Sequence, residues 1–180
     1  MIYVFLADGF EEIEALAPVD LLRRAGKQVK IAGVGKKEIK SSRDIRVIAD
    51  IEASEIELNS ELEMLVLPGG MPGTTNLEAC EKVLDAVKYC AENDIFIAAI
   101  CAAPSILGKL GLLKGRKATC YPGFEDKLEG AQVSGEAVEV DGKIITAKGA
   151  GVSVDFSLKL VEVLCGIGEA EKMRKGLQCV

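Results

Sequence analysis

The chain has 180 residues, of which 49% are hydrophobic and 28% are charged, with a formal net charge of −6 at pH 7. This composition is ordinary for a globular protein with its own core, so we expect a single domain over residues 1–180. The negative charge argues against nucleic acid as a partner, because phosphate binding requires a basic patch.

Strand-like and helix-like segments alternate along the chain, which is typical of a mostly parallel sheet covered by helices on both faces. The chain begins directly with a strand, without a basic leader, and no apolar run approaches the length of a membrane helix. We therefore expect a cytoplasmic α/β protein with no membrane partner. The predicted elements are strand 2–6, helix 11–25, strand 28–33, strand 64–67, helix 80–92, strand 95–100, helix 102–110, strand 143–147 and helix 151–165.

Two segments outside this alternation carry further signals. Asp141-Gly142 lies between two apolar segments and predicts a small antiparallel hairpin at the sheet. The stretch 35–60 is irregular, and we expect short edge strands near residues 45–48 together with loops.

The first strand leads into an acidic loop and then a helix. Glu11 and Glu12 fit solvent-exposed acids in a first helical turn, where they complement the helix dipole. Glu14 differs because Pro18, four residues later, lacks the N–H that would bond to the Glu14 carbonyl, so we expect a distorted helix there. A carboxylate in such a turn is a candidate general acid or base. A solvated helix acid is the alternative.

A glycine-rich loop follows the strand 64–67 and contains Gly69 and Gly70. Loops at the carboxyl ends of strands line the active-site crevice of α/β sheets. Glycines let backbone N–H groups approach a ligand closely, as an oxyanion hole requires. A plain turn is the alternative for this loop taken alone.

Cys101 is the candidate nucleophile. It ends the apolar run 95–100 and is followed by Ala102-Ala103-Pro104, in which Pro104 fits the first turn of a helix. Because the positive end of that helix would stabilise a thiolate, we expect the pKa of Cys101 to lie below its usual value of about 8.5. The chain contains no histidine, which excludes a cysteine–histidine dyad within it.

Six collinear segments resemble the ThiJ/PfpI superfamily, and most closely the clade of the Parkinson-disease protein DJ-one and its bacterial relatives. The resemblance implies a flavodoxin-like three-layer sandwich, usually a homodimer, with a reactive cysteine on a nucleophile elbow. The segments are DGFEEIE at 8–14, PVDLLRRAG at 18–26, SRD at 42–44, LPGG at 67–70, AAICAAP at 98–104 and TAKGAG at 146–151.

The resemblance assigns the central roles of the site. Cys101 matches the nucleophile, and Glu14 matches an acidic partner whose protonated side chain hydrogen-bonds the sulfur. Gly69, Gly70 and Ala102 match positions whose backbone N–H groups face the site. No metal or cofactor is implied.

The sequence leaves the roles of four further residues open. Arg24 and Arg43 match arginines near the pocket or dimer interface that attract an anion, and a solvated surface role is the alternative for each. Tyr121 stands where many relatives have a histidine beside the cysteine, and it is a hydrogen-bond donor but a poor base. Cys120, directly before it, is either a second redox thiol or a core cysteine.

The implied function is glyoxalase III or deglycase chemistry, without a cofactor, on a small aldehyde substrate. The substrate class is methylglyoxal-like α-oxoaldehydes or early glycation adducts. The alternative is a redox sensor or stress-protective chaperone, in which Cys101 is oxidised to the sulfinate beside protonated Glu14. Peptidase activity is not expected, because Tyr121 replaces the histidine that would protonate a leaving amine.

Overall fold

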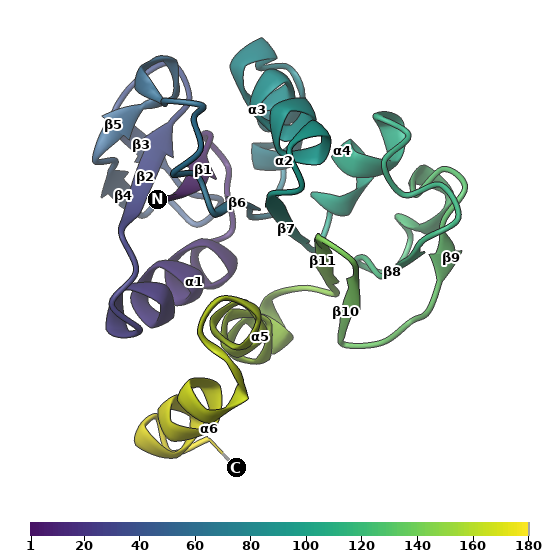
Figure 1. The fold of residues 1–180 in the computed structure, drawn as a ribbon. Helices are drawn as coiled ribbons and strands as arrows, with labels where there is room; N and C mark the ends of the chain where they lie inside the picture. The colour runs from purple at the N-terminus through teal and green to yellow at the C-terminus, as the bar shows by residue number, and fades with distance from the viewer. Residues whose placement is uncertain (180) are drawn as a thin grey trace.

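The computed structural model describes residues 1–179, and a seven-stranded sheet lies at its centre (Figure 1). Six of its strands are parallel, and β10 is antiparallel at one edge. In spatial order the strands are β10 (Val138–Asp141), β11 (Ile144–Ala147), β7 (Phe96–Ile100), β6 (Met64–Leu67), β1 (Ile2–Leu6), β2 (Val29–Gly33) and β5 (Ile51–Glu52). Two small sheets pair β3 (Glu38–Lys40) with β4 (Arg46–Ile48), and β8 (Lys117–Ala118) with β9 (Gln132–Val133).

Helices cover both faces of the central sheet (Figure 1). On one face, α1 (Glu12–Arg24) and α5 (Ser153–Cys165) pack against each other, and α6 (Ile167–Gly176) packs against α5. The opposite face carries α2 (Gly73–Glu78), α3 (Glu81–Glu92) and α4 (Pro104–Lys109). The 3-10 turns are η1 (Ala53–Glu55), η2 (Glu125–Lys127) and η3 (Ala150–Val152).

Each central strand contributes side chains to two separate cores. In β1, Val4 and Leu6 belong to the core on the α1 and α5 side, whereas Tyr3 and Phe5 belong to the core on the α3 side. Successive side chains of a strand point to opposite faces, so a strand covered on both sides is apolar throughout. This is why uninterrupted apolar runs predict a doubly covered parallel sheet, and the α/β fold class is confirmed.

The predicted elements agree with the structure to within two residues at each end. The hairpin at Asp141-Gly142 is also confirmed, since β10 and β11 pair there in antiparallel register. Two helices, α2 and α6, were not predicted. The expected distortion at Glu14 does not interrupt α1, which continues through Pro18 to Arg24.

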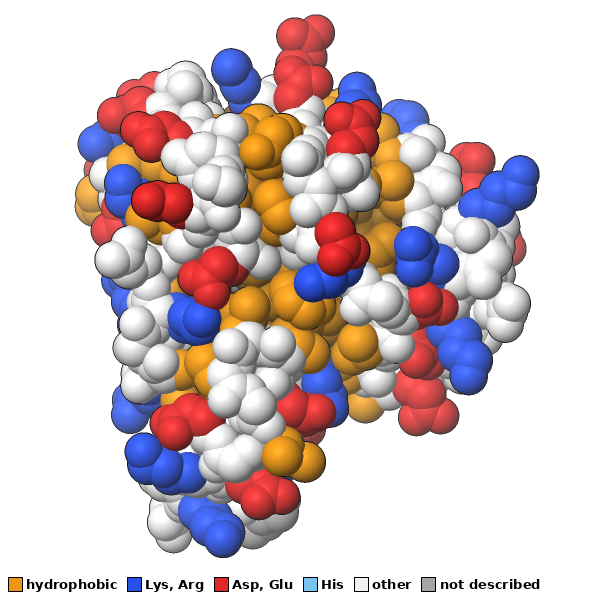
Figure 2. Space-filling model, in the orientation of Figure 1, with side chains coloured by type: hydrophobic (Ala, Val, Ile, Leu, Met, Phe, Trp, Pro, Cys, Tyr) orange, Lys and Arg blue, Asp and Glu red, His pale blue; other side chains and the backbone are white. Residues whose placement is uncertain are grey.

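The surface is of mixed charge on the face shown in Figure 2, where acidic and basic side chains are interspersed. Interspersed charges do not form the single-sign basic patch that a nucleic acid requires. Within residues 1–179, no helix combines the length and the apolar character needed to cross a bilayer.

Candidate active site

The candidate site lies at the carboxyl-terminal edge of the sheet. Four neighbouring parallel strands, β1, β6, β7 and β11, end there, and the segment after each strand contributes a residue. Glu14 follows β1, Gly69 follows β6, Cys101 follows β7 and Gly149 follows β11. The parallel topology therefore brings together residues that are far apart in the sequence.

Cys101 occupies a sharp turn at the end of β7. Its φ angle of 65° lies in the left-handed region, which costs a residue other than glycine roughly 1–3 kcal/mol. Two backbone hydrogen bonds hold this conformation: the Cys101 N–H donates to the Ala147 carbonyl, and the Tyr121 N–H donates to the Cys101 carbonyl, each at 2.8 Å. The thiol at this turn is partly exposed.

Glu14 is the neighbour of the thiol. Its side chain is only 1% exposed, and its Oε2 accepts a hydrogen bond from the Gly69 N–H at 2.9 Å. The carboxyl group also hydrogen-bonds the Cys101 thiol and the Ala150 N–H. Burial raises the pKa of Glu14 to about 7, although these hydrogen bonds oppose the rise. A carboxyl group with this pKa can accept or donate a proton near neutral pH.

The pKa of Cys101 is raised, not lowered. Burial is the largest cause, and the negative charge of Glu14 adds to it, so that the pKa reaches about 12. The N–H groups of Gly70 and Ala102 hydrogen-bond the sulfur and favour the thiolate, but they do not offset the first two causes. The predicted low pKa is therefore wrong, since it considered the start of α4 without the buried carboxylate. Between the pKa values of about 7 and about 12, the pair holds a single proton.

The glycine-rich loop passes very close to both side chains. A Cβ atom at Gly69 would lie 2.6 Å from the Cys101 Cβ and 2.7 Å from Glu14 Oε2, so no larger residue fits. Gly70 has a φ of 88°, a conformation that favours glycine. We expected the N–H groups of Gly69, Gly70 and Ala102 all to face the site. Those of Gly70 and Ala102 point to the sulfur, whereas that of Gly69 holds Glu14.

Tyr121 borders the same site. A Cβ atom at Gly149 would lie 3.2 Å from Tyr121 Cδ2 and 3.7 Å from Glu14 Oε1, so the tyrosine ring and the carboxyl group flank this glycine. The Tyr121 side chain is half exposed. Gly149 and Ala150 were not predicted as site residues, although they directly follow the strand 143–147 at the same sheet edge.

The two arginines lie away from the sulfur. Arg24 is near the end of α1, where its Nε donates to Asp20 at 2.8 Å. Arg43 lies in the turn between β3 and β4, and its guanidinium donates to the Ser42 carbonyl at 3.2 Å. Neither side chain hydrogen-bonds Cys101 or Glu14 among residues 1–179.

Glu12, Glu11 and Cys120 have structural roles near the site. Glu12 is buried rather than solvated: it accepts hydrogen bonds from the Ser41 hydroxyl and from the Arg43 N–H, the latter at 2.9 Å. Glu11 caps α1 by accepting the Glu14 N–H at 2.8 Å. Cys120 is 3% exposed and packs in the core on the opposite side of the sheet from Cys101, which favours a core role.

The chain and its fold are similar to known proteins. Residues 1–163 match the DJ-1/PfpI family. The chain is 40% identical over 179 residues to Protein DJ-1 homolog B of Arabidopsis thaliana. The match covers 98% of this chain and 39% of that protein. The chain thus spans about two fifths of that relative's length. It is 31% identical over 169 residues to a Caenorhabditis elegans protein named glutathione-independent glyoxalase DJR-1.2, covering 93% of this chain and 89% of that protein. The solved structure of oxidized Toxoplasma gondii DJ-1 is similar with a TM-score of 0.93 at 35% identity, covering 98% and 97% of the two chains.

Proposed function

Because this chain belongs to the DJ-1/PfpI family, we propose that it is a cofactor-independent enzyme of glyoxalase III or deglycase type. Its substrates would be methylglyoxal-like α-oxoaldehydes or early glycation adducts. The observation that carries this proposal is the buried Glu14 carboxyl group, whose pKa is about 7, in a hydrogen bond with the Cys101 thiol. A relative named as a glyoxalase supports the same class.

The first step is addition of the thiol to the aldehyde. Glu14 takes the proton from Cys101 Sγ as the sulfur forms a bond to the aldehyde carbon. The electrons of the C=O bond move to oxygen, which then takes the proton from Glu14 to give a hemithioacetal. In this proposal the Gly70 and Ala102 N–H groups, which point to the sulfur, stabilise the charge on this oxygen.

The second step moves a proton between neighbouring carbons. Glu14, again a carboxylate, removes the proton from the former aldehyde carbon to give an enediolate. The hydroxyl proton on that carbon passes to the neighbouring oxygen, and Glu14 returns its proton to the adjacent carbon. The product is a thioester of a 2-hydroxy acid on Cys101. Water then adds to the thioester carbonyl, the sulfur leaves with a proton, and lactate is released from methylglyoxal. The overall change is addition of water, so no oxidant or reductant is consumed.

The remaining predicted residues have supporting roles in this proposal. Tyr121 can donate a hydrogen bond to the bound aldehyde, while Glu14 performs every proton transfer because the chain has no histidine. We propose that Arg24 and Arg43 act at the interface of a homodimer, since neither contacts Cys101 in residues 1–179. The homodimer and the cytoplasmic location stay predictions.

Methylglyoxal consumption at neutral pH, with stereochemical analysis of the lactate, tests the enzyme. We expect Cys101→Ser and Glu14→Gln each to lose at least about 100-fold in turnover, because each removes a group that takes part in bond-making or proton transfer. The exposed Cys165 provides a matched control, and Cys165→Ser should retain native turnover. Native turnover in Cys101→Ser would overturn the proposal.

The redox sensor is the second candidate, and the partly exposed thiol beside a proton-donating Glu14 favours it. Two peroxide molecules would each transfer one oxygen atom to the Cys101 sulfur and leave as water, giving a sulfinate held by Glu14. Mass spectrometry after mild peroxide should show two oxygens on Cys101 before any other cysteine reacts. Absence of native methylglyoxal turnover together with this selectivity would favour the sensor over the enzyme.

A further inference from the structure

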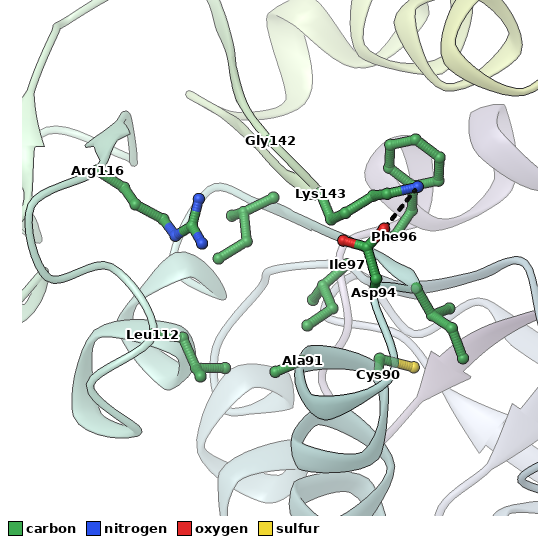
Figure 3. Close-up of a pocket in the computed structure, with 11 residues that line it drawn as sticks. Cys90, Ala91, Asp94, Phe96, Ile97, Leu112, Arg116, Gly142 and Lys143 are labelled. Atoms are coloured by element: carbon green, nitrogen blue, oxygen red, sulfur yellow. Dashed lines mark ion pairs between the residues drawn. The ribbon is translucent and has the colours of Figure 1, made fainter.

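A second cavity lies at the opposite edge of the sheet from Cys101. It has a volume of about 380 Å³ and is formed by the end of α3, the starts of β7 and β11, and the segment before β8 (Figure 3). This volume is within the range of small-molecule sites. Ile97 lines the cavity and precedes Cys101 by four residues of β7, so roughly 13 Å of extended strand separates the two sites.

Part of the cavity lining is apolar. Side chains from three elements meet there, and Figure 3 shows them converging on one space. The apolar lining residues are Ile95, Phe96, Ile97, Leu112 and Ile144. Cys90 also lines the cavity and is fully buried, and burial raises the pKa of its thiol to about 12. Unlike Cys101, it has no carboxyl group within residues 1–179 that hydrogen-bonds the thiol and could take its proton, so it is not a nucleophile at neutral pH. A ligand here would be held without a covalent bond.

The Arg116 guanidinium in the lining has unused hydrogen-bonding capacity. The Arg116 guanidinium extends toward the other lining side chains in Figure 3. One terminal nitrogen contacts Asp141, at 3.1 Å from Oδ1 and 3.4 Å from the carbonyl oxygen. Its Nε and second terminal nitrogen have no hydrogen-bond partner within residues 1–179. The other Asp141 oxygen accepts the Lys117 N–H at 2.9 Å, so that carboxylate is held by β8.

The other two charged lining residues, Lys143 and Asp94, form an ion pair with each other. The Lys143 ammonium lies 4.1 Å from the centre of the Phe96 ring and 3.6 Å from Asp94 Oδ2 (Figure 3). Arg116 also has an ion-pair partner, Asp141, which lies outside the lining, but this pair engages only one terminal nitrogen of the guanidinium. A guanidinium with free donors beside an apolar space matches an anion whose remaining body is apolar.

We propose that this cavity binds a small monocarboxylic acid with an apolar body. The carboxylate accepts hydrogen bonds from Arg116, and the apolar body contacts Ile97, Leu112 and Ile144. This site is independent of the aldehyde chemistry, so it stands or falls separately from the proposed function.

Phenylacetate is a suitable probe, and phenylacetamide is its uncharged counterpart. In a methyl NMR titration of the whole chain, phenylacetate should shift the methyl signals of Ile97, Leu112 and Ile144. Phenylacetamide should bind at least about tenfold more weakly, because it loses the charge-assisted hydrogen bonds. Absence of cavity shifts with phenylacetate, or equal binding of the amide, would overturn the proposal.

Substitutions of lining residues test whether phenylacetate binds in this cavity. Arg116→Gln should weaken phenylacetate binding about tenfold or more, whereas Arg46→Gln, which removes an exposed arginine on β4, should leave it unchanged. Ala91→Leu fills the cavity from α3 while keeping Arg116, so it should also weaken binding even if Arg116→Gln fails to fold. Cys101→Ser should bind as the native chain does. Loss of binding in Cys101→Ser, or native affinity in both Arg116→Gln and Ala91→Leu, would refute the cavity as the site.

Discussion

Glu14 is a buried acid whose polar contacts are a thiol and backbone N–H groups, with no cation beside it among the described residues. Removing a carboxyl group from water favours its protonated form, which is why burial dominates its pKa. The same burial makes ionised Glu14 costly to the folded state. At the level of single residues, proton exchange and stability thus depend on the same group.

The destabilisation caused by ionising buried Glu14 should appear in the pH dependence of the free energy of unfolding. The pKa of Glu14 rises from an ordinary value of 4.5 to about 7 on folding, so the native state loses stability as the pH rises between these values. The loss amounts to about 3 kcal/mol. Glu14→Gln keeps an acceptor for the Gly69 N–H and cannot ionise, so we expect it to lose less stability over this interval.

Urea unfolding of both proteins at pH 5 and pH 8 measures the difference directly. The same ionisation creates the general base, so methylglyoxal turnover of the native protein should rise with pH through about 7. Equal loss of stability in Glu14→Gln and the native protein would contradict the assigned pKa.

At the scale of elements, the site depends on the close approach of the loop after β6 to α1 and β7. The backbone at Gly69 passes between Glu14 on α1 and Cys101 at the end of β7. These segments can meet only where the loop carries no side chain. The glycine therefore determines how near the acid and the thiol lie to the loop N–H groups.

Gly69→Ala should separate these segments. Its Cβ would lie 2.6 Å from the Cys101 Cβ, so we expect a loss of roughly 1–3 kcal/mol in the free energy of unfolding and a marked loss of turnover. Gly168→Ala in α6 is the matched control, because nothing lies within 4 Å of the added atom and alanine favours a helix. Urea unfolding and the methylglyoxal assay give both readouts, and native behaviour of Gly69→Ala would show that the loop can move freely.

At the scale of the whole molecule, the two edges of the sheet carry different chemistry. The carboxyl-terminal edge holds the acid and the thiol, and the amino-terminal edge holds the cavity with Arg116. A third region is the outer surface of α1 and α5, where apolar side chains remain exposed. Ile13 is 54% exposed, and its helical neighbour Leu16 is 36% exposed.

This apolar surface gives a prediction about assembly. Exposed apolar groups on one helix face mark an interaction surface, so we expect the proposed homodimer to bury Ile13 and Leu16. Ile13→Arg should weaken dimerisation at least about tenfold in sedimentation velocity. Val133→Arg, at a similarly exposed apolar residue on β9, should have no effect. A monomeric native protein, or an unchanged dimer in Ile13→Arg, would contradict this assignment.

Local patterns in the sequence were sufficient to predict the order of the main strands and helices and the doubly covered parallel sheet. They were sufficient because apolar runs, helix caps and the Asp141-Gly142 turn act over a few neighbouring residues. The sequence also pointed to Cys101 and Glu14, the second with the help of a family resemblance. The short helix α2 and the terminal helix α6 were missed, since both have weaker local signals.

The electrostatics and the contacts of the site became clear only from the three-dimensional packing. The pKa of Cys101 depends on burial and on Glu14, which are set by packing between segments far apart in the sequence. The same is true of the Gly69 N–H that holds Glu14, and of the burial of Glu12. Burial and charge act through space, so a pattern read along the chain could name these residues but could not determine their protonation.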